Sequence, residues 1–353
     1  MRKPTHLLHA ACLAALFPLG GCNGNGNATG NEKETIVINI ADYRDRILRQ
    51  SDFATRIDTI ALHTGPYFMG PIVDFCLTDS MLYATDWDGA AWAFSLPSGN
   101  LVRRVRRIGH GHGEYASLRA IDAKDSCVYF LDSQSGQVLV NDARLDFERS
   151  FRVEFPALDF AKTDDGFLFC NLMATPQLHR LVHTDDEGHM LDSYLPSGME
   201  LDLIYENRTF TQGEDGDTYF AEPYANEVCR WTEQGPQPAF RTDYGKDNLE
   251  TGLKKGSEAE RTGHAFTTSV FVFNDRFVHR FFKEGTTCYS FAPLDGTPAL
   301  QGKPDTTACI PFGPAGQHAD ALACLYHTGD LQQWKPQRDS CEAVLVLFHL
   351  KRP

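Results

Sequence analysis

Three side chains that could bind a metal ion stand at alternate positions of one short glycine-rich segment. His110, His112 and Glu114 alternate with glycine along residues 109–113. Because alternate side chains of an extended segment point the same way, these three groups could share one divalent ion with a water molecule. Glycine alternation also suits a tight backbone path that needs no ligand. We expect a structural turn with positive φ at Gly111, and keep the divalent metal site as the alternative.

Two aspartates end equivalent strand-like segments. Asp86 follows residues 82–85, Asp132 follows residues 128–131, and a polar turn comes after each. An aspartate in this place commonly accepts backbone hydrogen bonds within the turn, and its repetition favours that structural role over catalysis. Calcium held by Asp86 and Asp88 is the alternative, although no complete loop of oxygen ligands can be read there.

Sequence motifs of common catalytic centres are missing. The chain has no Gly-x-Ser-x-Gly elbow, no His-Glu-x-x-His helix and no phosphate-binding Gly-x-x-x-x-Gly-Lys loop. Serine, histidine and aspartate are plentiful, so a triad assembled in space stays open and catalytic residues are unassigned. The four tryptophans can stack on sugar rings or fill the core: Trp87, Trp92, Trp231 and Trp334.

The N-terminus predicts export and lipidation. Arg2 and Lys3 precede an apolar run at 7–19 that is shorter than the roughly 20 residues needed to span a bilayer. This order is typical of a cleaved signal peptide, here over 1–21. Leu-Gly-Gly-Cys at its end is similar to the bacterial lipobox, which implies a lipid on Cys22. Asn and Gly then predict a flexible tether over 22–35. We expect a lipid-anchored protein of the bacterial cell envelope, at the outer membrane.

The net charge of the chain limits the classes of partner that it can bind. The formal net charge is −14, and loss of Arg2 and Lys3 with the signal peptide lowers it to −16. A polyanion is a poor ligand for nucleic acid or for anionic membrane surfaces, so we expect no nucleic-acid partner. The arginines at 103, 104, 106 and 107 alternate with apolar residues, which favours a solvated strand edge over an anion site.

The cysteines do not predict a metal site. Cys12 leaves with the signal peptide and Cys22 takes the lipid. Eight cysteines remain, without a Cys-x-x-Cys pair, so a structural zinc site has no support. Most of them stand in apolar runs, where we expect buried free thiols.

Short strands joined by turns dominate the rest of the chain. The one segment with a helical pattern is 40–53. The expected strands are 57–62, 81–85, 91–96, 127–131, 137–141, 167–171, 218–221, 228–231, 270–273, 277–282, 288–291 and 343–350.

An internal repeat relates these strands. Leu-Tyr-Ala-Thr-Asp at 82–86 recurs 46 residues later as Val-Tyr-Phe-Leu-Asp at 128–132, and weaker copies occupy 166–183 and 218–230. A unit of about 45–50 residues with four antiparallel strands matches a propeller blade. The 318 residues of 36–353 divide into six units of 53 or seven of about 45. We expect an all-β fold with a single six-bladed β-propeller, and seven blades as the alternative.

The two ends of the repeat region are expected to close the ring. Residues 57–62 and 343–350 are both strand-like, and they flank all other units. Pairing of these two segments would complete the last blade and leave no open sheet edge.

Several segments resemble a known family. Arg-Ile-Gly-His-Gly-His-Gly-Glu-Tyr at 107–115 is similar to its Gly-x-Gly-x-Gly-Glu-Tyr motif, and 57–62, 240–246 and 343–351 also match. On these residues the chain resembles the bacterial lipoprotein six-bladed β-propellers, which are largely of unknown function and NHL-like in shape. His112 stands where that family usually has proline. The resemblance implies a fold and an envelope location, and no particular reaction.

The lipid anchor, the repeat and the missing motifs together favour binding. We expect a cell-envelope lipoprotein whose non-catalytic propeller binds a protein, peptide or glycan through its loop face, without a cofactor. The alternative is a metal-assisted hydrolase or lyase that acts at the central channel of the propeller.

Overall fold

A computed structural model describes most of the chain after the N-terminal segment. The described residues are 35–40, 46–196, 208–222, 226–248, 263–283, 285–305, 315–327 and 342–352. They belong to a compact unit, 35–353, that is distinct from residues 1–34. The expected signal peptide and Cys22 lie outside the described residues, as do Cys309, Trp334 and Cys341. None of the described helices is long and apolar enough to cross a membrane.

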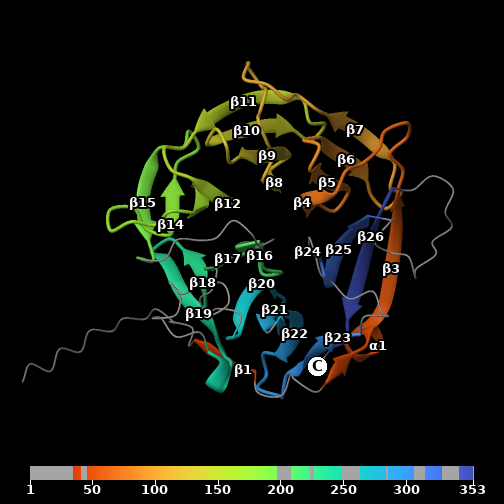
Figure 1. Ribbon diagram of the computed structural model, residues 1–353, viewed down its shortest axis with the longest axis vertical. Coiled ribbons are helices and arrows are strands. Elements are labelled where there is room, and N and C mark those ends of the chain that lie inside the picture. The colour runs from red at the N-terminus through yellow and green to blue at the C-terminus, as the bar shows by residue number, and fades with distance from the viewer. Residues whose placement is uncertain are drawn as a thin grey trace, which may run out of the picture. The chain divides into compact units, whose positions relative to one another are not determined.

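Six sheets form the blades of a β-propeller around a central channel (Figure 1). In each blade the first strand lies nearest the channel, and the next strands follow outward in antiparallel pairs. Blade 1 contains β4 (Ile72–Leu77), β5 (Met81–Asp86), β6 (Ala91–Ser95) and β7 (Leu101–Val105). Blade 2 contains β8 (Ala120–Lys124), β9 (Cys127–Asp132), β10 (Gln137–Asp142) and β11 (Phe147–Arg152). Blade 3 contains β12 (Ala157–Thr163), β13 (Gly166–Asn171), β14 (Leu181–Thr184) and β15 (Met190–Tyr194).

Blades 4 to 6 follow the same plan and take strands from the N-terminal part of the chain, which supplies a fifth strand to blades 4 and 5 and the fourth strand of blade 6. Blade 4 contains β16 (Phe210–Gln212), β17 (Thr218–Ala221), β18 (Glu227–Thr232), β19 (Gly235–Asp243) and β1 (Ile36–Asn39). Blade 5 contains β20 (Phe266–Val272), β21 (Arg276–Lys283), β22 (Thr286–Pro293), β23 (Leu300–Pro304) and β2 (Ile47–Leu48). Blade 6 contains β24 (Ala315–His318), β25 (Ala321–His327), β26 (Ala343–Leu350) and β3 (Ala54–Leu62). A short 3-10 helix, η1 (Gly245–Asp247), follows β19.

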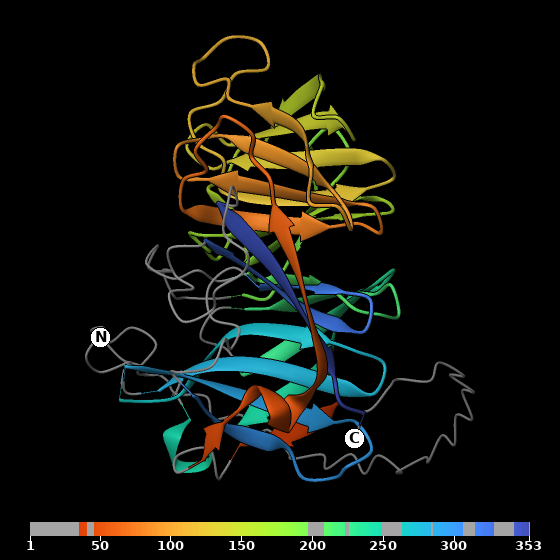
Figure 2. The same ribbon diagram turned by 90° about the vertical axis from the view of Figure 1, so that its right-hand side faces the viewer.

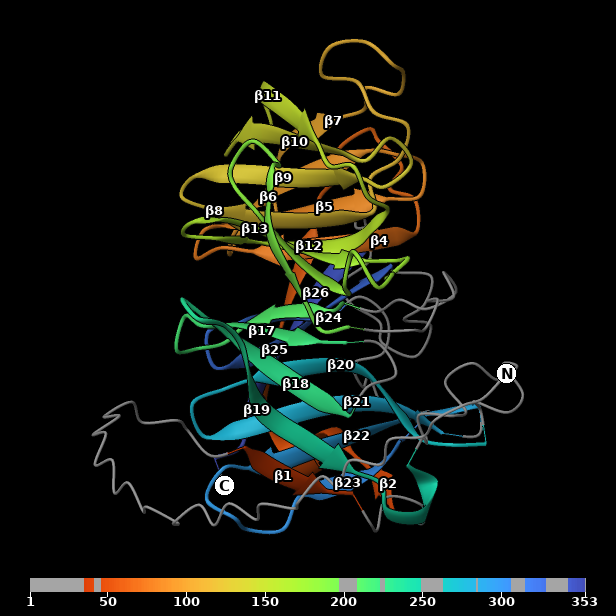
Figure 3. The same ribbon diagram turned by 90° about the vertical axis from the view of Figure 1, so that its left-hand side faces the viewer.

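The N-terminal strands are added to the outside of the ring. β1 and β2 pair in parallel with β19 and β23, as Figure 3 shows on one side of the molecule. β3 pairs antiparallel with β26 along its whole length, from Leu62 opposite Ala343 to Ala54 opposite Leu350 (Figure 2). This confirms the expected closing pair, in which the beginning of the propeller supplies the outer strand of its last blade.

The strand pattern of the sequence is confirmed. All twelve predicted segments fall mainly within strands, and the blades number six rather than seven. The helical interpretation of 40–53 was wrong for most of its described part, because β2 and the four-residue helix α1 (Gln50–Phe53) occupy it. Packing explains the short helix, since the ring of Phe53 stacks on Phe291 with 4.7 Å between centroids.

Apolar side chains fill the layers between neighbouring blades. In blade 1, Trp92 and Phe94 are fully buried and stacked, and they pack with residues of blade 6 such as Leu325. The six cysteines among the described residues are all free: Cys76, Cys127, Cys170, Cys229, Cys288 and Cys324. Five of these are buried, as expected from their apolar neighbours.

Candidate functional site

The histidine-glycine loop connects β7 to β8 and is held by its own contacts. The Glu114 carboxylate accepts a hydrogen bond from the Gly111 N–H at 2.8 Å, while the His112 ring packs edge-on against Phe147 with 4.8 Å between centroids. Among the described residues, no group of three His, Cys, Asp or Glu side chains is placed to hold a metal ion. The structure therefore does not assemble His110 with the other two residues as a ligand set.

The backbone of this loop differs from the sequence-based expectation. Positive φ occurs at Gly113, at 73°, and not at Gly111. A side chain at Gly113 would also meet the ring of Phe147 at 3.0 Å. The position that requires glycine is therefore Gly113, two residues after the predicted Gly111, because the loop packs against Phe147 in the outer strand of blade 2.

The strand-end acids are buried acceptors. Asp86 is 2% exposed, and it accepts hydrogen bonds from Ala90 N–H at 2.8 Å, Trp92 Nε1–H at 2.8 Å and Gly70 N–H at 3.2 Å. Asp132 is also buried and accepts from the N–H groups of Ala116, Ser117, Gln134 and Ser135 and from the Ser135 hydroxyl. Both carboxylates tie the turns of their own blade together.

A cavity of about 90 Å³ lies in the central channel. Its walls come from five inner strands, β4, β8, β12, β16 and β24, so the ring closure of the blades creates it. The polar residues that line it are Asp122, Lys124, Asp159, Lys162, Arg208, Thr211, Gln212, Thr218 and Gln317. This volume is large enough for several water molecules or one small polar molecule.

Three aspartates link consecutive blades beside the cavity. Asp74 accepts a hydrogen bond from Ile121 N–H of blade 2 at 3.0 Å. Asp122 accepts one from Lys162 N–H of blade 3 at 2.8 Å. Asp159 accepts two from Thr209 at the start of blade 4, from N–H at 2.7 Å and from the hydroxyl at 2.9 Å. The inner strands of blades 1, 2 and 3 thus each hold the start of the next blade through a fixed carboxylate.

Arg208 is the cation among these acids. Its Nη2 donates a hydrogen bond to the Phe75 carbonyl at 2.7 Å and lies 3.4 Å from Asp74 Oδ1. The side chain is 23% exposed, and no described residue accepts a hydrogen bond from its Nη1 or Nε atoms. A side chain added at Gly316 would meet Nη1 at 3.4 Å, which places that atom at the cavity wall formed by β24.

Burial changes the acid–base properties of this cluster. Burial raises the pKa of Asp74 to about 6, against the lowering effect of Arg208. Burial also raises the pKa of Asp122 above its ordinary value. For Arg208, burial lowers the pKa, but Asp74 and Asp159 raise it overall, so the guanidinium stays charged.

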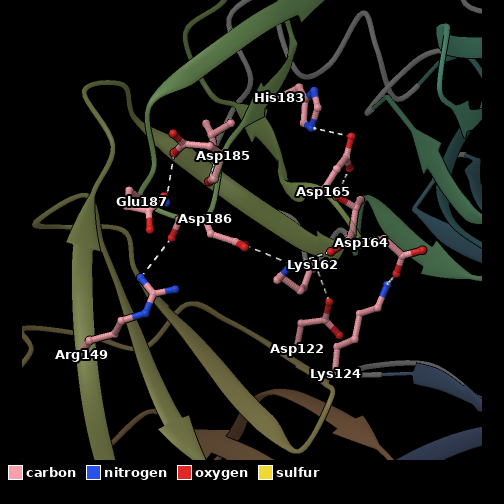
Figure 4. A network of polar contacts seen from close by, with 12 residues as sticks. Asp122, Lys124, Arg149, Lys162, Asp164, Asp165, His183, Asp185, Asp186 and Glu187 are labelled. Carbon is pink, nitrogen blue, oxygen red and sulfur yellow. Dashed lines mark hydrogen bonds and ion pairs between the residues drawn. The ribbon is translucent and has the colours of Figure 1, made fainter.

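Two lysines that line the cavity pair with carboxylates that do not line it, and Figure 4 shows both pairs. Lys124 pairs with Asp164, and the Lys162 ammonium lies 3.1 Å from Asp186. Each lysine charge is therefore matched by a carboxylate from a turn.

Asp74→Asn is expected to change how stability depends on pH. Because the folded pKa of Asp74 is raised, the folded state binds its proton more tightly than the unfolded state. The proton on Asp74 therefore adds to the free energy of unfolding of the wild type at pH 4, and this contribution is lost as the pH rises through 6. The shift corresponds to about 3 kcal/mol. Urea unfolding of both proteins from pH 4 to 7.5 would show the variant gaining relative to wild type, and a constant difference would contradict the assignment.

The sequence carried a weak indication of these channel residues. Asp74, Asp122 and Asp159 each interrupt a short apolar segment: 72–77, 120–123 and 157–161. A charged residue in the middle of an inner strand is expected only where that strand lines a channel or accepts a fixed hydrogen bond. Arg208 carried no such pattern, because it precedes a three-residue strand.

Comparison with known proteins places the chain in a family. A family model described as a domain of unknown function, DUF4934, matches residues 35–341, which is the whole propeller except its last described strand. This chain belongs to that family. The match confirms the resemblance to propellers of unknown function, and the DUF4934 description assigns no activity. A search of curated proteins finds no match.

Solved structures share the DUF4934 fold of this chain at low identity. A Bacteroides fragilis protein described as exported is 13% identical, with a TM-score of 0.71 over 90% of this chain and 100% of that one. A Bacteroides vulgatus member of the DUF4221 family is 8% identical, with a TM-score of 0.52 over 85% of this chain and 98% of the other. At these identities the likeness shows the fold alone.

Proposed function

We propose that this protein is a lipid-anchored, non-catalytic binding protein of the bacterial cell envelope, and that its channel cavity holds a small polar ligand. The observation that carries the proposal is the cavity, whose wall bears fixed charges from several blades. Asp74, Asp122 and Asp159 are oriented by backbone N–H groups of the following blade.

The described residues favour the channel over the loop face as the binding site. Segments 197–207, 249–262 and 306–314, which join one blade to the next, lie outside them. No geometry among the described residues favours the metal-assisted hydrolase, since none of them form a group of three ligands. The lipobox-like residues 19–22 support the envelope location, and the fold neighbour that is described as exported is in keeping with it.

Cys22→Ala is expected to move the protein out of the membrane fraction, or to leave it with its signal peptide attached. Each buried acyl methylene contributes about 0.8 kcal/mol, so several chains hold the protein firmly. Immunoblots of membrane and soluble fractions would test this, with labelled fatty acid to detect the lipid. Membrane association and labelling equal to wild type would contradict the anchor.

Ligand binding is tested on soluble protein from residue 23 onward. Thermal unfolding in a panel of small polar molecules should reveal stabilising compounds for wild type. Gln212 is exposed and lines the cavity, so Gln212→Trp should cap it and abolish the stabilisation without a clash. Gln237→Trp, on the outer strand β19, is the matched control and should bind as wild type does. Equal stabilisation of the capped variant would contradict a channel site.

A further inference from the structure

Arg208 reaches across the central channel. It precedes β16 of blade 4, and its Nη2 donates to the Phe75 carbonyl of blade 1 at 2.7 Å. Blade 1 lies across the six-bladed ring from blade 4 (Figure 1). A side chain at Gly316 of blade 6 would meet Nη1 at 3.4 Å. The guanidinium therefore stands within the channel, where Arg208 forms part of the cavity wall.

The carboxylates that line the cavity already accept hydrogen bonds through all four of their oxygens. Asp122 accepts from Ala123 N–H through Oδ1 and from Lys162 N–H through Oδ2, both at 2.8 Å. Asp159 accepts from Phe160 N–H through Oδ1 at 2.9 Å, and through Oδ2 from the start of blade 4. The protein itself thus supplies donors to these acids, which reduces their need for a donor from a ligand.

The cations of the wall differ in the donors that they leave free. Lys124 and Lys162 pair with Asp164 and Asp186. Arg208 contacts its partners through Nη2 alone, and no described residue accepts a hydrogen bond from Nη1 or Nε. Guanidinium N–H groups form their strongest hydrogen bonds with charged oxygen acceptors. The free donors of the wall therefore favour an anion as the ligand.

The acids around Arg208 favour a single negative charge on that ligand. The lining residues carry three cations against two carboxylates, Asp122 and Asp159. Asp74 does not line the cavity, but it lies 3.4 Å from Nη2 and shares the charge of the guanidinium. A phosphate group, which carries a charge of about −1.5 to −2 at pH 7, meets more repulsion from these acids than a carboxylate does.

We propose that the ligand of the channel is a small monocarboxylate whose carboxylate group binds Arg208. This inference rests on the proposed function of the cavity. Thr211 and Thr218 line the same cavity and provide hydroxyl groups for further polar atoms of the ligand. Phe75 and Leu77 add apolar wall against which a short alkyl chain can pack. The cavity volume of about 90 Å³ limits the length of that chain.

Calorimetric titration with four small probes separates the ligand chemistries: propionate, inorganic phosphate, propylamine and 1-propanol. At pH 7.5, propionate is expected to bind at least about 10-fold more tightly than any other probe, because it alone matches the guanidinium as a monoanion. Propionate that binds no more tightly than another probe, while some polar compound still stabilises the protein, would overturn this inference and leave a channel binding protein. Failure of all four probes and of the whole polar panel would overturn both.

Arg208→Lys is the matched variant test. Lysine keeps the positive charge but loses the fork of donors, so propionate affinity should fall at least about 10-fold while 1-propanol affinity stays unchanged. Arg230→Lys is the control, because the Arg230 side chain is 21% exposed, against 23% for Arg208, and lies 3.2 Å from Asp217. Arg230 does not line the cavity, so this variant should bind propionate as wild type does. Equal propionate affinities of the two variants would contradict the inference.

Asp74→Asn tests the same contact in the opposite direction. Asparagine keeps an acceptor for Ile121 N–H but removes the charge that competes for Arg208. Propionate affinity should therefore rise several-fold at pH 7.5, with 1-propanol affinity unchanged. Unchanged or weaker propionate binding in this variant would contradict the role of Arg208, and this test remains decisive if Arg208→Lys does not fold.

Discussion

Ile60→Pro is expected to destabilise the whole propeller by about 2–4 kcal/mol, because it breaks the pair of strands that closes the ring. Ile60 stands opposite Leu345 in the β3–β26 ladder. The Ala61 carbonyl faces Gly99 of blade 1, and His63 N–H donates to the Gly99 carbonyl. The backbone N–H and C=O groups of Ala61 and His63 therefore point away from β26. The N–H of Ile60 must therefore point toward β26. Proline removes it and leaves the carbonyl of the buried residue Leu345 unpaired.

Ala61→Pro is the matched control for this prediction. The N–H of Ala61 points outward from β26, so proline is tolerated there as on other edge strands. We expect Ala61→Pro to stay within about 1 kcal/mol of wild type. Chemical unfolding of the three proteins measures the difference. Equal stability of Ile60→Pro and Ala61→Pro would show that hydrogen bonds between β3 and β26 do not close the ring.

Asp86→Ala is expected to cost about 3–5 kcal/mol, because three buried donors lose their acceptor at once. These donors are Gly70 N–H, Ala90 N–H and the Trp92 indole, and they connect two turns to the core of blade 1. Asp86→Asn retains one acceptor oxygen and should fall between wild type and alanine. Differential scanning calorimetry would rank the three proteins.

A chelator separates this structural role from the calcium alternative. If Asp86 acts through these hydrogen bonds, excess EDTA leaves the melting temperature of wild type unchanged. If Asp86 and Asp88 hold calcium, EDTA lowers the wild-type melting temperature toward that of the alanine variant. The second result would restore a metal site at this turn.

The fold could be predicted because its determinants are local and repeated. The segments 82–86 and 128–132 each show a strand followed by a turn, and the same unit length recurs along the chain. The closing pair was also predictable, since 57–62 and 343–350 are strand-like segments at the two ends of the repeat region. The helix over 40–53 was mispredicted because pairing of β2 with β23 overrides the local preference, while Phe53 packing keeps only the four residues of α1 helical.

The candidate site could not be predicted from local patterns. Asp74, Asp122 and Asp159 are 48 and 37 residues apart, and only ring closure brings Asp122 and Asp159 to the wall of one cavity, with Asp74 beside its Arg208. Their hydrogen bonds connect different blades, so no single segment contains both donor and acceptor. The most distinctive motif of the sequence, the loop with His112, instead folds against Phe147 through its own contacts.

Amide hydrogen exchange with and without a bound ligand tests the central claim most directly, because it reports where the ligand acts. The N–H groups of Ile121, Lys162 and Thr209 donate to the channel carboxylates. For a compound that stabilises the protein, we expect added protection in peptides of β4, β8, β12 and β16, and none in the loop 106–119. Protection confined to that loop or to the outer strands, with the inner strands unchanged, would contradict a channel binding site.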